Sequence, residues 1–415
     1  MKTFHTTRHL PASASEIFQA FQSPERFARW WGPKGFINTF HHFDFQKNGH
    51  WSFTMHGPDG KNYPNECVFN EIQFPFLIQI QHLSEPHFVL KIELQETPHG
   101  TDLSWTQIFE NSKIADQIAE IVIPSNEQNL DRLNSEILQA GSKIDAIGKT
   151  SLLVAAMRAR ETTLTPPDQR LFQDPYAESL AGTLGSDLLY KALRDSGDQP
   201  AIAVRTYYMD QKILKAIQDG VQQIVVLAAG MDTRAYRLSL PKNIHIFELD
   251  RTEVLNYKNV ILQGHEPTCH RHVLRVDLRH DWKNDLLQSG FQSSKRTLWL
   301  VEGLLMYLEE PHVLNLFSKI NSLAQPRDIL LCDIFTKALL EAPHMKKQLQ
   351  FLQQMGASWH FGIQNEPEEF MRDLGWQAQA TQPGEVVPSR WPFPVTPRNI
   401  PNVPRSYFLE AMKSV

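Results

Sequence analysis

The chain has 415 residues, of which 41% are hydrophobic, and this length and composition suit two domains that each have a core. A net charge of −5 argues against a protein that binds nucleic acid through bulk electrostatics, because phosphate contacts need a basic face. Three scattered cysteines, no signal peptide and no apolar run of ~20 residues indicate a cytoplasmic protein without a disulfide framework, a metal knuckle or a membrane helix.

The first predicted domain, residues 1–140, has the pattern of an α+β unit. An alternating segment at 3–9 precedes a helix that Ser13 or Ser15 could cap. A helical stretch at about 113–140 ends the domain, and a strand meander can curl around such a helix. The strand-like segments between the two helices are 41–46, 50–56, 66–73, 76–83, 88–96 and 101–109.

Several motifs in this domain resemble the START-like (SRPBCC) superfamily of the heat-shock-ATPase-activator type. They are Pro11-Ala12-Ser13, SPERFARWWGP at 23–33, NGHWSFTMHGPDG at 48–60 and Gly100-Thr101. The resemblance implies a helix-grip fold with an apolar cavity, and so an apolar ligand or a protein partner. The alternative is that the large aromatic residues fill the core. These residues are Trp30, Trp31, Trp51 and Trp105.

A hinge is predicted at 141–150, and residues 151–415 then alternate between apolar strand-like runs and helical or irregular crossovers. This alternation is typical of a mostly parallel, doubly wound α/β sheet. The predicted strands are 223–228, 244–249, 272–277, 297–302 and 329–335, with a terminal strand at 405–412. The crossovers include 233–238, 251–263 and 311–324.

The most informative stretch is 223–250, which reads as strand, tight turn, helix, strand and acid. Asp250 follows Gly230 by 20 residues, the distance at which such folds hydrogen-bond a ribose. The turn lacks the three glycines of a dinucleotide site, and Asp232 would repel a phosphate at the helix N-terminus. A nucleoside without phosphate, such as S-adenosylmethionine, fits better. The alternative is a turn that binds nothing.

Polar residues also follow the later strands, where open α/β sheets bind ligands. Asp277 and Leu278 could recognise an adenine, although Asp277 could equally be a turn residue. Glu302 ends a strongly apolar strand, which favours a role in a cavity. Arg205 could hold a carboxylate or form a surface salt bridge.

Taken together, the motifs of this half resemble the leucine carboxyl methyltransferase-like family, in its branch of bacterial S-adenosylmethionine-dependent O-methyltransferases. The motifs are RARET at 158–162, LFQDPYA at 171–177, Arg205-Thr206 with Asp210, VVLAAGMDTRAYRL at 225–238, FELDRTEVLNYK at 247–258, VDLRHDW at 276–282, WLVEGLLMYL at 299–308 and RSYF at 405–408. The resemblance implies a Rossmann-like methyltransferase fold with S-adenosylmethionine as its cofactor.

The resemblance also implies residue roles. Arg160 and Arg205 would hold the methionine carboxylate, and Glu302 would lie near the sulfonium and amino groups. The turn from Ala228 to Gly230 would pack against the cofactor. Asp250 would take the ribose, and Asp277 with Leu278 the adenine. Many members have glycine where this chain has Ala228, so the extra methyl group could narrow the approach.

The predicted reaction is methyl transfer to a carboxylate or hydroxyl of a small, polyketide-like molecule or of a protein carboxy-terminus. A carboxylate needs no base, whereas a hydroxyl does. Tyr207, His360 and Asp333 are candidates for that base, and no metal is required. The alternative is a protein that binds an apolar ligand or regulates a chaperone or phosphatase, with a methyltransferase-like half that has lost turnover.

Overall fold

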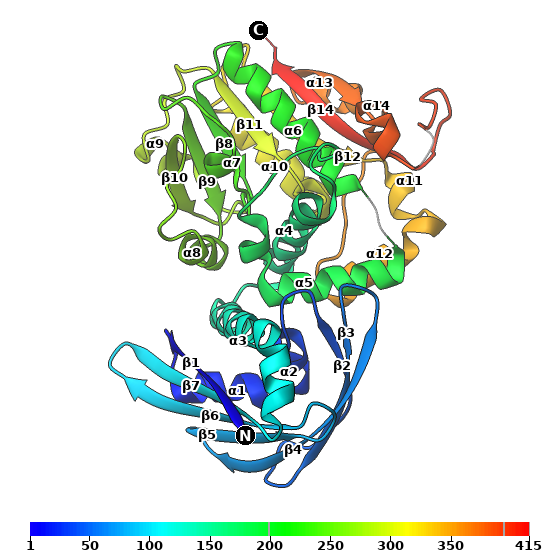
Figure 1. The fold of residues 1–415 in the computed structure, drawn as a ribbon. Helices are drawn as coiled ribbons and strands as arrows, with labels where there is room; N and C mark the ends of the chain where they lie inside the picture. The colour runs from blue at the N-terminus through cyan, green and yellow to red at the C-terminus, as the bar shows by residue number, and fades with distance from the viewer. Residues whose placement is uncertain (198–199, 393–394, 415) are drawn as a thin grey trace. The chain divides into compact units, whose positions relative to one another are not determined.

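The computed structural model describes residues 1–197, 200–392 and 395–414. The chain divides into two compact units (Figure 1). The first comprises residues 1–141 together with 182–187, and the second comprises residues 142–181 and 188–415. The segment predicted as a hinge is partly helical, because helix α4 already begins at Ala146.

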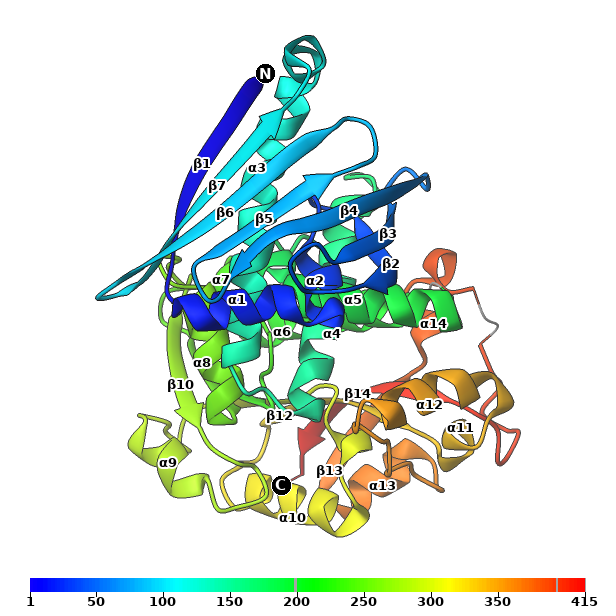
Figure 2. The same ribbon diagram turned by 90° about the horizontal axis from the view of Figure 1, so that it is seen from below.

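The first unit contains a seven-stranded antiparallel sheet in the order β1-β7-β6-β5-β4-β3-β2 (Figure 2). Its strands are Lys2–Leu10, Ile37–Phe43, His50–His56, Asn62–Gln73, Leu77–His82, Phe88–Thr97 and Gly100–Phe109, numbered β1 to β7. Its helices are α1 (Ala14–Gln22), α2 (Pro24–Trp30) and α3 (Ser112–Gly141). The predicted cap is confirmed at Ser13, which forms a capping box with Glu16.

Aromatic side chains fill much of the interior of this unit. Trp30, Trp51 and Trp105 are almost completely buried. The Phe27 ring lies 5.0 Å from that of Trp51, and the Trp31 ring lies 5.8 Å from that of Trp105. Such pairs stabilise a core beyond the area that they bury. This packing is what the core-filling interpretation of the tryptophans predicts, while the apolar ligand of this unit stays a prediction.

The second unit is built on a seven-stranded mixed sheet in the order β10-β9-β8-β11-β12-β14-β13. Strands β8 to β12 are mutually parallel. Strand β14 runs antiparallel to β12 on one side and to β13 on the other, so the edge strand β13 has the same direction as β8 to β12 (Figure 1). The strands β8 to β14 are Gln223–Leu227, His245–Asp250, His270–Arg275, Thr297–Val301, Ile329–Phe335, Trp376–Thr381 and Ser406–Lys413. All five residues of β8 and of β11 are buried, as expected for central strands covered on both faces.

Helices α4 to α6 precede β8, and the later helices and short helical turns connect the strands. The α-helices are α4 (Ala146–Leu164), α5 (Ala177–Ser196), α6 (Ala201–Gln218), α7 (Arg234–Arg237), α8 (Thr252–Ile261), α9 (Lys283–Gln288), α10 (Glu310–Asn321), α11 (Lys337–Leu340), α12 (Lys346–Gln354), α13 (Pro367–Asp373) and α14 (Pro383–Val386). Three 3₁₀ turns lie at Leu305–Tyr307, Pro343–Met345 and Pro388–Arg390. Helix α10 packs on one face of the sheet, where Val313 and Phe317 join the core around Trp299.

All six strands predicted in this half are present within two residues of their predicted bounds. Strand β13 was not predicted, because QAQA at 377–380 offers no apolar or β-branched pattern. Within the residues described here, no helix combines the length and the apolar character that crossing a membrane requires.

Candidate functional site

A cavity opens in the second unit where the parallel strands β8, β11 and β12 end. The turn after β8 contributes Ala228 to Arg234, and β11 is followed by Glu302 and Gly303. Strand β12 contributes Asp333 and Phe335. Polar side chains thus gather at the carboxyl edge of a parallel sheet, where open α/β sheets bind ligands.

The turn after β8 has a backbone that glycine would adopt most readily. Ala228 has φ +59° and Gly230 has φ +46°, both in the left-handed region. A Cβ atom at Gly230 would lie 2.9 Å from the Cβ atom of Ser151 on α4, so glycine is needed at this position for space as well as for conformation. The turn therefore places its backbone against α4 and against the cavity.

Asp250, at the end of β9, holds this turn. Its carboxylate accepts the backbone N–H of Gly230 at 2.7 Å and that of Arg251 at 2.7 Å. Burial raises the pKa of Asp250, and these two backbone hydrogen bonds oppose the shift. Each carboxylate oxygen accepts one backbone N–H and retains a second lone pair, so the group can fix the turn and still accept from a ligand.

Two carboxylates hold Arg205, which projects from α6 into the cavity. Its Nε donates to Glu302 at 2.9 Å and its Nη1 to Asp333 at 2.9 Å. The second Asp333 oxygen accepts the backbone N–H of Gly303 at 2.7 Å. A Cβ atom at Gly303 would lie 3.2 Å from Arg205 Nη2, so the missing side chain lets the guanidinium pack against the backbone.

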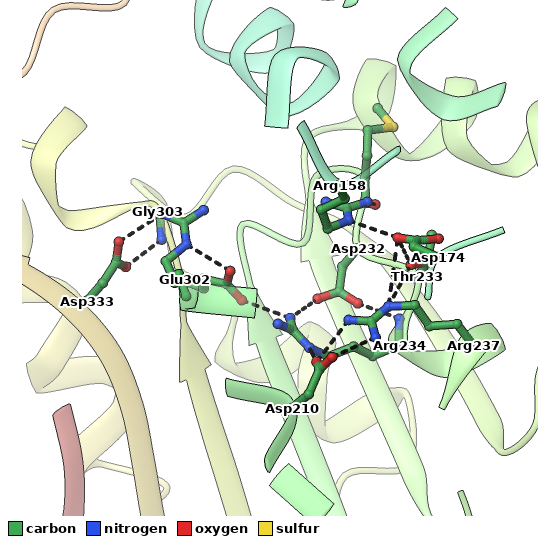
Figure 3. A network of polar contacts seen from close by, with 12 residues as sticks. Arg158, Asp174, Asp210, Asp232, Thr233, Arg234, Arg237, Glu302, Gly303 and Asp333 are labelled. Carbon is green, nitrogen blue, oxygen red and sulfur yellow. Dashed lines mark hydrogen bonds and ion pairs between the residues drawn. The ribbon is translucent and has the colours of Figure 1, made fainter. Parts of the chain in front are cut away.

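The network continues across the floor of the cavity (Figure 3). Arg234 contacts Glu302 at 2.8 Å, Asp210 at 2.7 Å and also Asp232. Arg237 donates two hydrogen bonds to Asp210. Beyond them, Arg158 donates to Asp174 at 2.8 Å and to the carbonyl oxygen of Met231.

Among the described residues, this network contains four arginines and five carboxylates, so its formal charge is −1. Burial would raise the pKa of Glu302, but Arg234 and Arg205 outweigh burial and hold that pKa below its ordinary value. The pKa of Asp232 is likewise lowered, since Arg234 and Lys258 overcome the effect of burial. The cavity floor therefore presents ionised carboxylates.

Two guanidinium nitrogens at the cavity have no hydrogen-bond acceptor among the described residues. They are Nη2 of Arg205 and Nη1 of Arg158, both on residues that line the cavity. These nitrogens can donate to an anionic group on a ligand. The site thus offers donors for an anionic group and a carboxylate-rich floor for cationic groups.

Not all the predicted cofactor residues line this cavity. Those that line it are Arg205, Ala228, Gly230 and Glu302. Asp250 does not line the cavity, but it accepts a hydrogen bond from Gly230, which does. Asp277 is bonded to Arg279, whose hydrogen bonds lower the pKa of Asp277 to about 2. Leu278, next to it, packs partly buried against the core of the sheet.

Arg160 lies elsewhere. It lines a second cavity, while Arg158, two residues earlier on α4, faces the first. The RARET motif contains two arginines, and their positions on a helix point them in different directions. The sequence pattern alone cannot choose between them without knowing which face of α4 meets the turn.

Of the three candidate bases, only Asp333 lines the cavity. His360 is bonded through its backbone to Met306 and its ring lies 3.4 Å from Glu309. Tyr207 is half-buried on α6 and lines neither cavity. Among the described residues, no group of three or more histidine, cysteine or acidic side chains could hold a metal ion.

The sequence did not identify Arg234, Arg237 and Asp174 as site residues. They lie in the short motifs MDTRAYR and FQDPYA, so their presence was visible, but the pairing of Arg237 with Asp174 and of Arg234 with Asp210 was not. Tyr307, Trp359 and Phe408 were also not identified, and they line the cavity from three separate segments of the chain.

Two family models match the chain. The model described as leucine carboxyl methyltransferase matches residues 151–321, and that of the activator of Hsp90 ATPase homolog 1-like protein matches 11–137. A solved structure of an AHSA1-like protein from Aeromonas hydrophila is 19% identical and covers 34% of this chain and 94% of its own, with a TM-score of 0.29.

Curated relatives match the second half. A Mycolicibacterium smegmatis protein is 35% identical over 253 residues, which cover 56% of this chain and 84% of that protein. A Mycobacterium bovis protein is 39% identical over 208 residues, which cover 46% of this chain and 66% of that protein. Both bear the name "Putative S-adenosyl-L-methionine-dependent methyltransferase". The chain therefore belongs to the leucine carboxyl methyltransferase family, joined to a domain of the Hsp90-ATPase-activator type.

Proposed function

We propose that this protein is an S-adenosylmethionine-dependent O-methyltransferase that methylates a carboxylate or hydroxyl of a small molecule. The observation that carries the proposal is the buried network at the carboxyl edge of the sheet. It combines a formal charge of −1 with two guanidinium nitrogens that lack acceptors among the described residues. S-adenosylmethionine has one carboxylate and two positive groups, so its charges complement those of the network.

The architecture of the second unit supports a Rossmann-like methyltransferase fold. The run of adjacent parallel strands, β10-β9-β8-β11-β12, has β8 at its centre, between β9 and β11. From β8 the chain first adds β9 and β10 on one side of the sheet, and then returns to add β11 and β12 on the other. Ligands of doubly wound sheets bind at such a switch point. The turn after β8 and the acid after β9 are therefore where an adenosine is expected.

We assign the adenosine to the ends of β9 and β10. The carboxylate of Asp250 would accept the ribose hydroxyls with the lone pairs that the backbone leaves unused. Asp277 and the backbone of Leu278 would bind the adenine. Because Asp277 is bonded to Arg279, the side chain of Arg279 would have to move aside or lie over the base.

We assign the methionine end to the network. Nη2 of Arg205 would donate to its carboxylate, and Arg158 rather than Arg160 would be the second donor, since Arg158 lines this cavity. Glu302 and Asp232 would face its positive groups. Both carboxylates have lowered pKa values and stay ionised, which favours cations in a site that excludes water.

When bound, S-adenosylmethionine supplies an electrophilic methyl group on a sulfonium, which an acceptor oxygen displaces to leave the neutral thioether S-adenosylhomocysteine. The protein then has to align the acceptor and exclude water. Asp333 forms an ion pair with the buried Arg205 at 2.9 Å, and a proton on this carboxylate would weaken that pair, so Asp333 is poorly suited to act as a base. This arrangement favours a carboxylate acceptor, which needs no base.

A transfer assay tests this proposal. The full chain is incubated with methyl-labelled S-adenosylmethionine and panels of carboxylic acids and phenols, and label is followed into organic-soluble products. Treatment with mild base separates the outcomes, because methyl esters are hydrolysed and methyl ethers survive. Base-labile label is the expected result. Binding of S-adenosylmethionine without labelled product from either panel would contradict O-methyl transfer and favour the non-catalytic binding protein.

A further inference from the structure

A second cavity lies beside the first within the same unit. Its volume is about 400 Å³, against about 230 Å³ for the first. None of the network residues described above lines it, so the charged site does not account for it. Its walls come from α4, the C-terminal half of α5, the start of α6 and α12.

These walls are mainly apolar. Leu153, Met157 and Leu164 recur on α4 at spacings that place them along one helix face. Helix α5 adds Leu189, Ala192 and Leu193, which are half-buried rather than buried. Apolar side chains that line a cavity and stay partly accessible gain free energy when an apolar ligand covers them.

The charges in this cavity include a pair that is already neutralised. Arg390 donates to Glu161 at 2.7 Å and to the carbonyl oxygen of Gln169 at 2.9 Å. Glu161 also accepts the backbone N–H of Leu171 at 2.8 Å and the hydroxyl of Thr165 at 3.1 Å. This pair therefore gives no reason to expect a charged group on a ligand in the cavity.

The two cavities adjoin. Five residues line both of them: Leu153, Met157, Ile202, Gln348 and Leu352. Only one of these side chains is polar, and Met157 is unbranched, so it can change rotamer to open a passage. The first cavity also has apolar lining residues of its own, among them Met306 and Phe335.

We infer that the second cavity is the binding site for the body of the methyl acceptor. The acceptor is then an elongated, mainly apolar molecule whose reactive oxygen reaches the first cavity between Met157 and Leu352. This inference rests on the proposed methyl transfer and adds the class of substrate. A cofactor at the network and an apolar acceptor in the second cavity bind at the same time, since they occupy different volumes.

The neutral fluorophore N-phenyl-1-naphthylamine serves as the probe, because its emission rises in apolar surroundings. Its affinity for the full chain is measured with and without saturating S-adenosylmethionine. Ala192→Trp fills the second cavity from α5, and Leu193→Trp is the second filling variant. The matched control is Gln353→Trp, which puts the same side chain on an exposed position of α12. Calorimetry with S-adenosylmethionine reports the cofactor site of each variant.

The expected result is probe binding that survives saturation with S-adenosylmethionine and weakens about tenfold or more in the filling variants, a loss of about 1.4 kcal/mol, with no change in the control. Cofactor affinity should stay within about twofold throughout. Unchanged probe affinity in folded filling variants, or displacement of the probe by S-adenosylmethionine, overturns the inference while the proposed function stands. Absence of cofactor binding to the unmodified chain overturns both.

Discussion

Glu302 is an acidic residue in a largely buried position, where its carboxylate costs free energy of folding unless it is paired. It follows the fully buried strand β11, where an unpaired carboxylate would be strongly unfavourable. Arg205 and Arg234 compensate by contacting one oxygen each. A buried ion pair adds little net stability, although removing one partner is destabilising. The residue is thus better explained by the ligand charge that it faces than by the stability of the fold.

Acid should destabilise the second unit through this network. The pKa values of Asp232 and Glu302 are lower in the folded chain than their ordinary values of 3.8 and 4.5. Their stabilising effect is therefore complete above about pH 4.5 and is lost as the pH falls through the lowered values. Thermal melts between about pH 6 and pH 3 should show a melting temperature that falls below pH 4.5.

Glu302→Gln provides the control for this acid effect. It should lower the free energy of unfolding near pH 7 by about 3–5 kcal/mol, because two guanidinium groups lose a buried partner. In acid, the melting temperature of this variant should fall less steeply than that of the unmodified chain, since one titrating group is gone. An equally steep decline would show that Glu302 does not contribute to the acid sensitivity.

The backbone of Ala228 is strained, because a φ of +59° is unfavourable for any residue that has a Cβ atom. Ala228→Gly removes about 1–2 kcal/mol of backbone strain in the folded chain. It also costs about 0.5–1 kcal/mol of stability, because glycine loses more conformational entropy than alanine on folding. We expect a net stabilisation of up to about 1.5 kcal/mol in chemical denaturation, with cofactor affinity unchanged or improved. A loss of stability greater than about 1 kcal/mol would contradict the strain argument.

At the scale of elements, the site depends on how closely α4 approaches the turn after β8. Asp145 caps α4 by accepting the backbone N–H of Gly148 at 2.8 Å, and its carboxylate also pairs with Arg251 after β9. The first turns of α4 are thus fixed beside the end of β9. Farther along the helix, Arg158 reaches the carbonyl oxygen of Met231 in the turn. Helix α4 therefore connects the two ends of the candidate site.

Gly230→Ala should push α4 and the turn after β8 apart. Its Cβ atom would lie 2.9 Å from Ser151 Cβ, so α4 or the turn has to move. Gly220→Ala is the matched control, because Gly220 also has a positive φ, +96°, but nothing lies within 4 Å of the added atom. We expect the Gly230 variant to lose about 1 kcal/mol more than the control in chemical denaturation, and to bind cofactor more weakly. Equal losses would show that the contact with α4 is unimportant.

Much of the fold could be predicted because apolar runs and turn residues are local signals. The run at 223–227, the cap at Ser13 and the strand at 329–335 all appear in the structure. Strand β13 and helix α2 could not be predicted in the same way. Strand β13 owes its structure to pairing with β14. Helix α2 begins with the local signals Ser23 and Pro24, but its seven residues are too few to be stable without tertiary packing.

The site could be predicted only in part, for a related reason. Spacing along the chain located Asp250 relative to Gly230, and their hydrogen bond is present. The pairing of Arg234 with Glu302, or of Arg205 with Asp333, joins residues far apart in sequence and is visible only after folding. The choice between Arg158 and Arg160 depends on the orientation of α4, which one sequence does not encode locally.

At the scale of the whole molecule, the two units differ in how their interiors are stabilised. The first relies on stacked and edge-on aromatic rings around Phe27 and Trp51. The second combines an aliphatic sheet core with a buried ion network at one edge. All residues of the candidate site and of the second cavity belong to the second unit, so the proposed chemistry requires no residue of the first.

Isothermal titration calorimetry of the full chain with S-adenosylmethionine and S-adenosylhomocysteine tests whether the second unit holds a cofactor site that depends on Asp250. We predict that both bind, with one site per chain. Asp250→Ala should weaken both at least a hundredfold, because each lost hydrogen bond to the carboxylate contributes about 1.5–3 kcal/mol. The exposed Glu266→Ala, a matched loss of one acid, should leave both affinities unchanged. Absence of binding by either compound, or full affinity in Asp250→Ala, would contradict the account.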